Sequence, residues 1–118
     1  MPYVDGFVLA VPKARLEEYK TMAKRAGEVW KEHGAHDYVE SIADDVPYGE
    51  QTSFPRAVEA KPDEIVVFSF ATYEDRAHRD EVMKKVMDDP RMKADMEKMP
   101  FDGKRMIYGG FKSFVELH

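Results

Sequence analysis

The sequence predicts an α+β protein with a ferredoxin-like fold, in which a four-stranded antiparallel sheet carries helices on one face. The first observation is that extended and helical patterns follow one another in the order β-α-β-β-α-β. Right-handed crossovers interleave two such βαβ units into one sheet. The second observation is that the strands are apolar on both faces, although helices can cover only one. We therefore expect a second copy of the chain to cover the other.

All 118 residues (1–118) are expected to form a single ferredoxin-like domain, because a chain of this length buries a core without disulfides or metals. The composition, 43% hydrophobic and 35% charged, is typical of a globular protein. An irregular insertion at about 45–63 holds three prolines around a short apolar piece, FPRAV. Connections this long are usually mobile or functional.

The first strand is YVDGFVLAVP, residues 3–12, which is apolar at alternate positions on both faces. Asp5 interrupts this run and no basic segment precedes it, so we interpret it as a strand and not as a signal peptide. A helix over 13–33 follows, because apolar residues recur there at three- and four-residue spacing. Trp30 falls on the apolar face of this helix and is expected to point at the sheet.

Three further strands and a second long helix complete the pattern. The strands are expected at 35–44, 64–73 and 103–117, and the helix at 74–87. The strand at 64–73 is the most apolar, which predicts a central position in the sheet. These segments fix the order of the ferredoxin-like fold.

Asp89 and Pro90 are expected to begin a short third helix as its N-cap and first residue. Methionines recur at helical spacing in this part of the chain. We interpret them as core residues, because flexible thioethers fill gaps between helix and sheet. They are Met83, Met87, Met92, Met96 and Met99.

The sheet face without helices is expected to be apolar and to form a homodimer with a second copy, as in a dimeric α+β barrel. This face carries Tyr3, Phe7, Leu9, Tyr38 and Phe111, or their alternates along each strand.

Gly109 and Gly110 interrupt the last strand. Glycines inside a strand indicate a bulge, a bend or the close approach of another group. A bulge would curve the edge of the sheet around a partner. Alternatively, the glycines leave room for the backbone or an aromatic ring of a ligand.

The charge pattern argues against some partners. The net charge is −5, from 18 basic and 23 acidic residues, and no basic stripe appears, so we expect no nucleic-acid partner. No apolar run approaches the roughly 18 residues of a membrane-spanning helix, so we expect no membrane partner. The absence of cysteine fits the reducing cytoplasm, where we expect the protein to reside.

Two residues are candidate catalytic bases. Asp5 lies on a strand expected to neighbour that of Lys112, so the two form either an ion pair or, if Asp5 faces the dimer cleft, a carboxylate with a shifted pKa. His36 is the second candidate. A metal site needs three or four converging ligands, and a helix end separates His33 from His36. We therefore expect no metal and no cofactor.

Aromatic and basic side chains suit a ligand held between two copies of the chain. Arg56 and Arg105 suit an anionic ligand, or equally the salt bridges of a dimer. The candidate ligand-binding residues are Tyr3, Phe7, Tyr38, Arg56, Arg105, Tyr108 and Phe111.

Four segments resemble the YbaA-like family of small bacterial proteins: YVDGFVLAVP, ADDVPYG, MDDPRMK and MPFDGKRMIYGGF. The resemblance spans essentially the whole chain. It implies the fold of the dimeric α+β barrels, in agreement with the strand pattern. It implies no activity, because the function of the family is not established.

The wider barrel superfamily includes cofactor-independent monooxygenases, haem-degrading enzymes and isomerases. The monooxygenases resemble one another in a constellation of Asn, Trp and His, but this sequence contains no asparagine. We therefore expect a homodimer that binds a small, partly aromatic or anionic molecule in the cleft between subunits. The alternative is a cofactor-independent monooxygenase- or isomerase-type enzyme with Asp5 or His36 as its base.

Overall fold

The structure, a computed structural model, describes residues 2–118 and contains a four-stranded antiparallel sheet of order β2-β3-β1-β4. This order confirms the ferredoxin-like fold. It also places β3, the most apolar strand, at the centre beside β1. The strands are β1 at Tyr3–Pro12, β2 at Asp37–Ile42, β3 at Glu64–Tyr73 and β4 at Ile107–Lys112.

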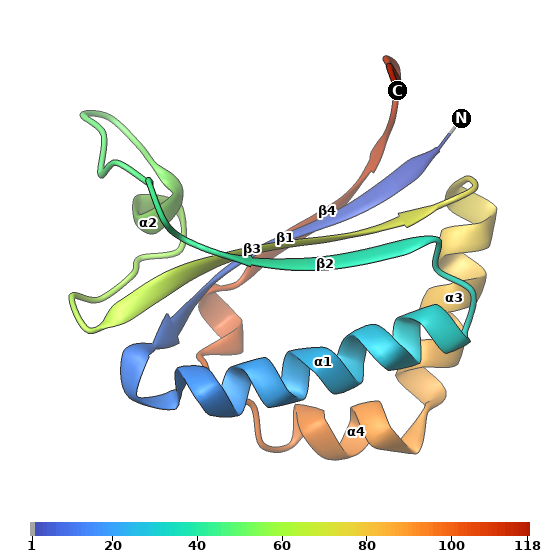
Figure 1. Ribbon diagram of the computed structural model, residues 1–118, viewed down its shortest axis with the longest axis horizontal. Helices are drawn as coiled ribbons and strands as arrows, with labels where there is room; N and C mark the ends of the chain where they lie inside the picture. Colours follow the sequence, from blue (N-terminus) through green and yellow to red (C-terminus); the bar gives the residue numbers. More distant parts are fainter. Residues whose placement is uncertain (1) are drawn as a thin grey trace.

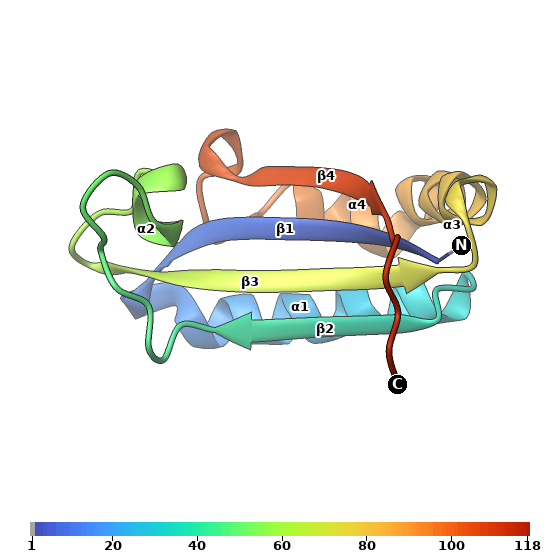
Figure 2. The same ribbon diagram turned by 90° about the horizontal axis from the view of Figure 1, so that it is seen from above.

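The three main helices lie on one face of the sheet (Figure 1). These are α1 at Leu16–Glu32, α3 at Arg76–Asp88 and α4 at Pro90–Met96. Figure 2 shows α1 behind β2 and β3, and α4 behind β1 and β4. Asp89 accepts a hydrogen bond from the backbone N–H of Arg91, which confirms it as the N-cap of the third helix. None of the helices within residues 2–118 is both long and apolar enough to cross a membrane.

The face of the sheet opposite the helices is here called the open face. On β1 and β2 the aromatic residues expected on this face lie on the helix side, and the residues that alternate with them along each strand lie on the open face. Tyr3 and Tyr38 lie on the helix side, because the hydroxyl of Tyr3 accepts a hydrogen bond from Arg79 of α3 and that of Tyr38 lies beside α1. On β4, Phe111 does lie on the open face, where it is 65% exposed. The other exposed apolar residues of this face are Val39, Phe68 and Ile107.

The insertion covers one end of the open face. Its only regular element is the short helix α2 at Phe54–Ala57, whose N-cap Ser53 accepts a hydrogen bond from the N–H of Arg56. Val58, which follows α2, is buried against side chains of β1 and β3. In Figure 2 the C-terminal residues after β4 pass in front of β1, β3 and β2, and Phe114, Val115 and Leu117 of this segment are all exposed.

The last strand is shorter than the expected span of 103–117. Residues Gly103–Arg105 form the 3-10 turn η2, capped by Asp102, and β4 ends at Lys112. Lys112 pairs with Tyr3, the first residue of β1, and the backbone N–H of Ser113 donates to the carbonyl oxygen of Pro2, the first described residue, at 3.0 Å. The chain then leaves the sheet on its open side (Figure 1).

The two adjacent glycines of β4 do not form a bulge, because every residue from Ile107 to Lys112 pairs with one residue of β1. The expected bulge is therefore wrong. Gly110 instead admits a neighbouring aromatic ring: a Cβ added there would lie 2.6 Å from Cε2 of Tyr3 and close to Arg79. Gly109 faces the other side, where an added Cβ would be 3.6 Å from the ring of Phe111, an ordinary contact.

These two positions offer a matched pair of substitutions. We expect Gly110→Ala to destabilise the protein by about 1–3 kcal/mol, because the methyl group must displace the Tyr3 ring. Gly109→Ala is the control and should change stability by less than about 0.5 kcal/mol. Urea unfolding followed by circular dichroism measures both. Equal losses in the two variants would contradict the role assigned to Gly110.

Candidate functional site

A cavity of about 750 Å³ lies between the helix-facing side of the sheet and the helices α1, α3 and α4. Seven of the eight methionines of the sequence line it, and the eighth, Met1, lies outside the described residues. The seven are Met22, Met83, Met87, Met92, Met96, Met99 and Met106. Six aromatic residues complete most of the wall: Phe7, Tyr19, Trp30, Tyr38, Phe101 and Tyr108.

The methionines therefore do more than fill the core. Met92 is buried in the core cluster and Met83 packs against it, as expected. Met87 and Met96 are exposed, so the cavity reaches the surface beside them. Thioether side chains adapt their rotamers to the shape of a neighbour, which suits a wall that must accept a ligand.

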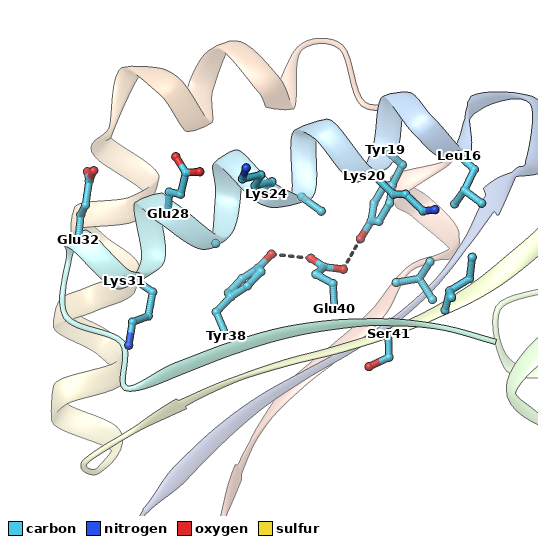
Figure 3. A pocket seen from close by; sticks show the side chains of 14 residues that line it. Leu16, Tyr19, Lys20, Lys24, Glu28, Lys31, Glu32, Tyr38, Glu40 and Ser41 are labelled. Atoms are coloured by element: carbon cyan, nitrogen blue, oxygen red, sulfur yellow. Dashed lines mark hydrogen bonds between the residues drawn. The ribbon is translucent and has the colours of Figure 1, made fainter. Parts of the chain in front are cut away.

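A second hollow of about 680 Å³ runs between α1 and β2 and shares four lining residues with the cavity (Figure 3). The shared residues are Tyr19, Ala23, Tyr38 and Glu40. Gly27 of α1 allows the ring of Tyr38 to reach this position, because a Cβ there would lie 2.8 Å from Cδ1 of that ring. The two hollows therefore meet at one polar cluster.

The centre of this cluster is the half-buried carboxylate of Glu40. The hydroxyl of Tyr19 donates to Oε1 at 2.7 Å, and that of Tyr38 donates to Oε2 at 2.5 Å (Figure 3). Burial, reinforced by the charge of Glu40, raises the pKa of both phenols above the ordinary value. Both hydroxyls therefore remain protonated donors at neutral pH.

Glu40 has no cationic partner among residues 2–118: it forms no ion pair with any lysine, arginine or histidine there. Two neutral phenols solvate its charge without cancelling it. The cavity therefore contains an unbalanced carboxylate beside a largely apolar wall.

Asp5 does not line the cavity. Its carboxylate accepts a hydrogen bond from the Tyr73 hydroxyl at 2.9 Å and lies 3.4 Å from Nε of Arg79. Burial raises the pKa of Asp5, although the hydrogen bond from Tyr73 and the charge of Arg79 oppose this shift. The expected pair with Lys112 is wrong, since Lys112 lies opposite Tyr3 in the sheet.

His36 and Arg56 also lie outside the cavity. His36 is exposed, with Nε2 3.9 Å from the carboxylate of Glu74. Arg56 donates to the backbone carbonyls of Tyr48 and Gly49, each at 3.0 Å, and so holds the insertion together. Both side chains are occupied by contacts within the chain.

Arg105 forms a bidentate ion pair with Glu64, in which both N–O distances are 2.7 Å. Arg105 also donates to the carbonyl oxygen of Glu59 at 2.8 Å. This hydrogen-bonded guanidinium holds the pKa of Glu64 well below its ordinary value, at about 2. The ion pair of Arg105 with Glu64 therefore joins η2 to the start of β3, which is a structural role.

Of the seven candidate ligand-binding residues, the cavity brings together Phe7, Tyr38 and Tyr108. The rings of Phe7 and Tyr108 stack with centroids 6.4 Å apart. Tyr3 is buried beside Gly110. The remaining candidates lie on the open face or in the ion pairs and loop contacts described above.

Glu40 and Tyr19 were not among the candidates, although one signal pointed to them. Glu40 shares a strand face with Tyr38 and Ile42, and this face was expected to be apolar. A carboxylate on a face that packs against a helix needs a donor or a cation. Tyr19 of α1 supplies such a donor.

Residues 2–103 match a family model described as "Protein of unknown function (DUF1428)". "Uncharacterized protein YbaA" from Escherichia coli (strain K12) is 52% identical over 116 residues, which cover 98% of this chain and 99% of that protein. The protein of the same description from Shigella flexneri matches to the same extent.

Two solved structures share the fold at low sequence identity. SnoaB, a cofactor-independent oxygenase from Streptomyces nogalater, has a TM-score of 0.60 at 12% identity, covering 98% of this chain and 96% of SnoaB. A dimeric ferredoxin-like protein from an uncultured marine organism also has a TM-score of 0.60 at 12% identity, covering 100% of this chain and 99% of that one.

Proposed function

Because this chain belongs to the DUF1428 family of proteins of unknown function, we propose its function from its own side chains: it binds a small, largely apolar molecule in the methionine-lined cavity. One observation carries the proposal, namely that seven thioethers and six aromatic residues surround a hollow of about 750 Å³. Ligand pockets commonly measure roughly 300–1,000 Å³ and combine an apolar wall with a few polar groups. This site lies within one chain, whereas the sequence suggested the cleft between two copies.

A cofactor-independent enzyme is the second candidate. Glu40 favours it, because this carboxylate lines both hollows and is placed to accept a proton from a bound molecule. Neither Asp5 nor His36 lines them. The similarity to an oxygenase shows a shared fold and leaves the reaction to be tested. A bound molecule that changes mass during incubation in air would favour the enzyme.

The proposal includes a homodimer formed through the open face, in the cytoplasm. Phe111, Phe68 and Ile107 expose apolar surface there, and exposed apolar patches on a sheet favour association. The structural relative from the marine organism is a dimer, which supports the same assembly for this fold. A second copy covers the apolar face without any further partner.

Native mass spectrometry of freshly purified protein tests ligand binding. We expect an additional bound mass that is lost on denaturation. Met87→Trp places an indole at the mouth of the cavity and should remove most of this mass, because the larger side chain fills space that the ligand needs. Leu117→Trp is the control, since Leu117 is exposed after the last strand, and it should retain the ligand. Wild-type protein without bound mass or extractable small molecule would contradict the proposal.

A further inference from the structure

We infer that the molecule bound in the cavity is an organic cation, with an amine or ammonium group attached to an apolar or aromatic body. This inference rests on the proposed function and adds the charge of the ligand. It follows from the charges of the cavity wall, from the free acceptor positions of Glu40 and from the aromatic rings around it.

The charged wall is acidic, and only part of it is neutralised. Its charged residues are Glu40, Asp95, Asp102 and Lys104. Arg25 binds Asp95 through two hydrogen bonds of 2.8 and 3.1 Å. Arg105 binds Asp102 at 3.1 Å. Glu40 is therefore the carboxylate of this wall that has no arginine partner within residues 2–118.

Glu40 has acceptor capacity left for a ligand. A carboxylate offers about four lone-pair sites, and the hydroxyls of Tyr19 and Tyr38 occupy one on each oxygen. An ammonium group has three donors and no acceptor, so it can use the remaining sites and balance the charge. A carboxylate or phosphate on the ligand would instead meet a like charge.

The rings of Tyr19 and Tyr38, which bind Glu40, and the rings packed against them suit the same group. The centroids of Trp30 and Tyr38 lie 5.5 Å apart, and those of Tyr19 and Phe101 lie 5.7 Å apart. All four line the cavity. The faces of such rings attract cations, tryptophan most strongly, and the methionine wall accepts the apolar body.

The lysines of the outer groove do not reverse this preference. Lys20 forms an ion pair with Glu17 at 3.2 Å, and Lys31 donates to the carbonyl oxygen of His36. These two and Lys24, the third lysine of the groove, line the groove beside α1 and not the methionine-lined wall, whose single lysine is Lys104. A ligand group that enters as far as Glu40 therefore meets negative charge.

Three probes of one carbon skeleton separate charge from shape: phenylbutylamine, phenylbutanol and phenylbutyrate. Trp30 is the single tryptophan of the chain and lines the cavity, so its fluorescence reports binding directly. We expect the amine to bind about tenfold or more tightly than the alcohol, in the range of a hydrogen bond to a charged group. The acid should bind more weakly than the alcohol.

Glu40→Gln retains the shape of the side chain and removes its charge. It should make the affinities for the amine and the alcohol about equal, chiefly by weakening the binding of the amine. Glu28→Gln alters an exposed carboxylate of the outer groove and should leave all three affinities unchanged. Tyr19→Phe keeps the charge of Glu40 and removes one hydroxyl donor, so it should preserve or strengthen amine binding. Thermal unfolding verifies that each variant is folded.

The outcomes separate this inference from the proposed function. Equal binding of amine and alcohol to the wild type would overturn the cationic ligand and leave the apolar binding site standing. Tighter binding of phenylbutyrate would do the same and indicate an anionic ligand. An unchanged preference in Glu40→Gln would show that another group selects the charge. Failure of all three probes, together with protein that carries no bound mass, would overturn both.

Discussion

Replacing Arg105 with methionine is expected to destabilise the fold strongly, because it removes one partner of a part-buried, bidentate ion pair and leaves the carboxylate of Glu64 without its cation. The side chains of Arg105 and Glu64 are only 15% and 4% exposed. Methionine keeps much of the apolar stem but leaves the carboxylate of Glu64 buried without its cation. It also removes the donor to the carbonyl oxygen of Glu59. Urea unfolding at neutral pH and one fixed protein concentration measures the loss.

The control for this substitution is Arg76→Met. Arg76 and Asp80 also form an ion pair, but at 3.7 Å and with side chains that are 74% and 54% exposed. Solvent screens such a pair, so its loss should cost less than about 1 kcal/mol. Similar losses at the two arginines would show that the pair of Arg105 with Glu64 is not the stabilising contact described above.

The pH dependence checks the same pair independently. Because Arg105 lowers the folded-state pKa of Glu64 from 4.5 to about 2, its stabilising contribution is present above pH 4.5 and is lost as the pH falls toward 2. In Arg105→Met, burial without a cation makes protonation of Glu64 favourable. The stability gap between wild type and variant should therefore narrow on acidification. A gap of constant size over this range would contradict the assigned cause.

Replacing Phe111 with glutamate is expected to dissociate the proposed homodimer. Phe111 is 65% exposed on the open face, and two copies of a new carboxylate would have to be buried in the interface. We expect the dimer dissociation constant to rise about thirtyfold or more, corresponding to ~2 kcal/mol for a central interface residue. Sedimentation equilibrium at several concentrations separates the monomer of 13.6 kDa from a species of twice that mass.

Lys112→Glu provides the matched control, because Lys112 is the next residue of β4 and faces the other side of the sheet. This variant gains a carboxylate on the same strand and should remain dimeric. A monomeric wild type would overturn the homodimer. A Phe111→Glu variant that stays dimeric would place the interface elsewhere on the molecule.

The order of the elements could be predicted from the sequence, but the faces of the strands could not. Trp30 was expected to point at the sheet, and its Nε1 does donate to the hydroxyl of Tyr73 at 3.0 Å. β1 is apolar on both faces, so its alternation does not determine which face meets the helices. Contacts between distant residues settle this, among them the 3.0 Å hydrogen bond between Tyr3 and Arg79.

The cavity was beyond prediction for a similar reason. Methionines at three- and four-residue spacing mark one face of a helix, whether that face meets a packed core or a hollow. The difference depends on where α3 and α4 lie relative to β4, which local sequence does not specify. The glycines of β4 were ambiguous in the same way, because the group that approaches Gly110 belongs to Tyr3, at the other end of the chain.

A wall built from thioethers also has a chemical vulnerability. Oxidants convert methionine to its sulfoxide, which replaces a soft apolar surface with a polar and chiral one. Met87 and Met96 are exposed and line the cavity, so they meet a dissolved oxidant before buried Met92 does. Oxidation would thus make the entrance polar while the core stayed intact. Oxidation of these two methionines is therefore expected to lower the affinity of the cavity for apolar molecules.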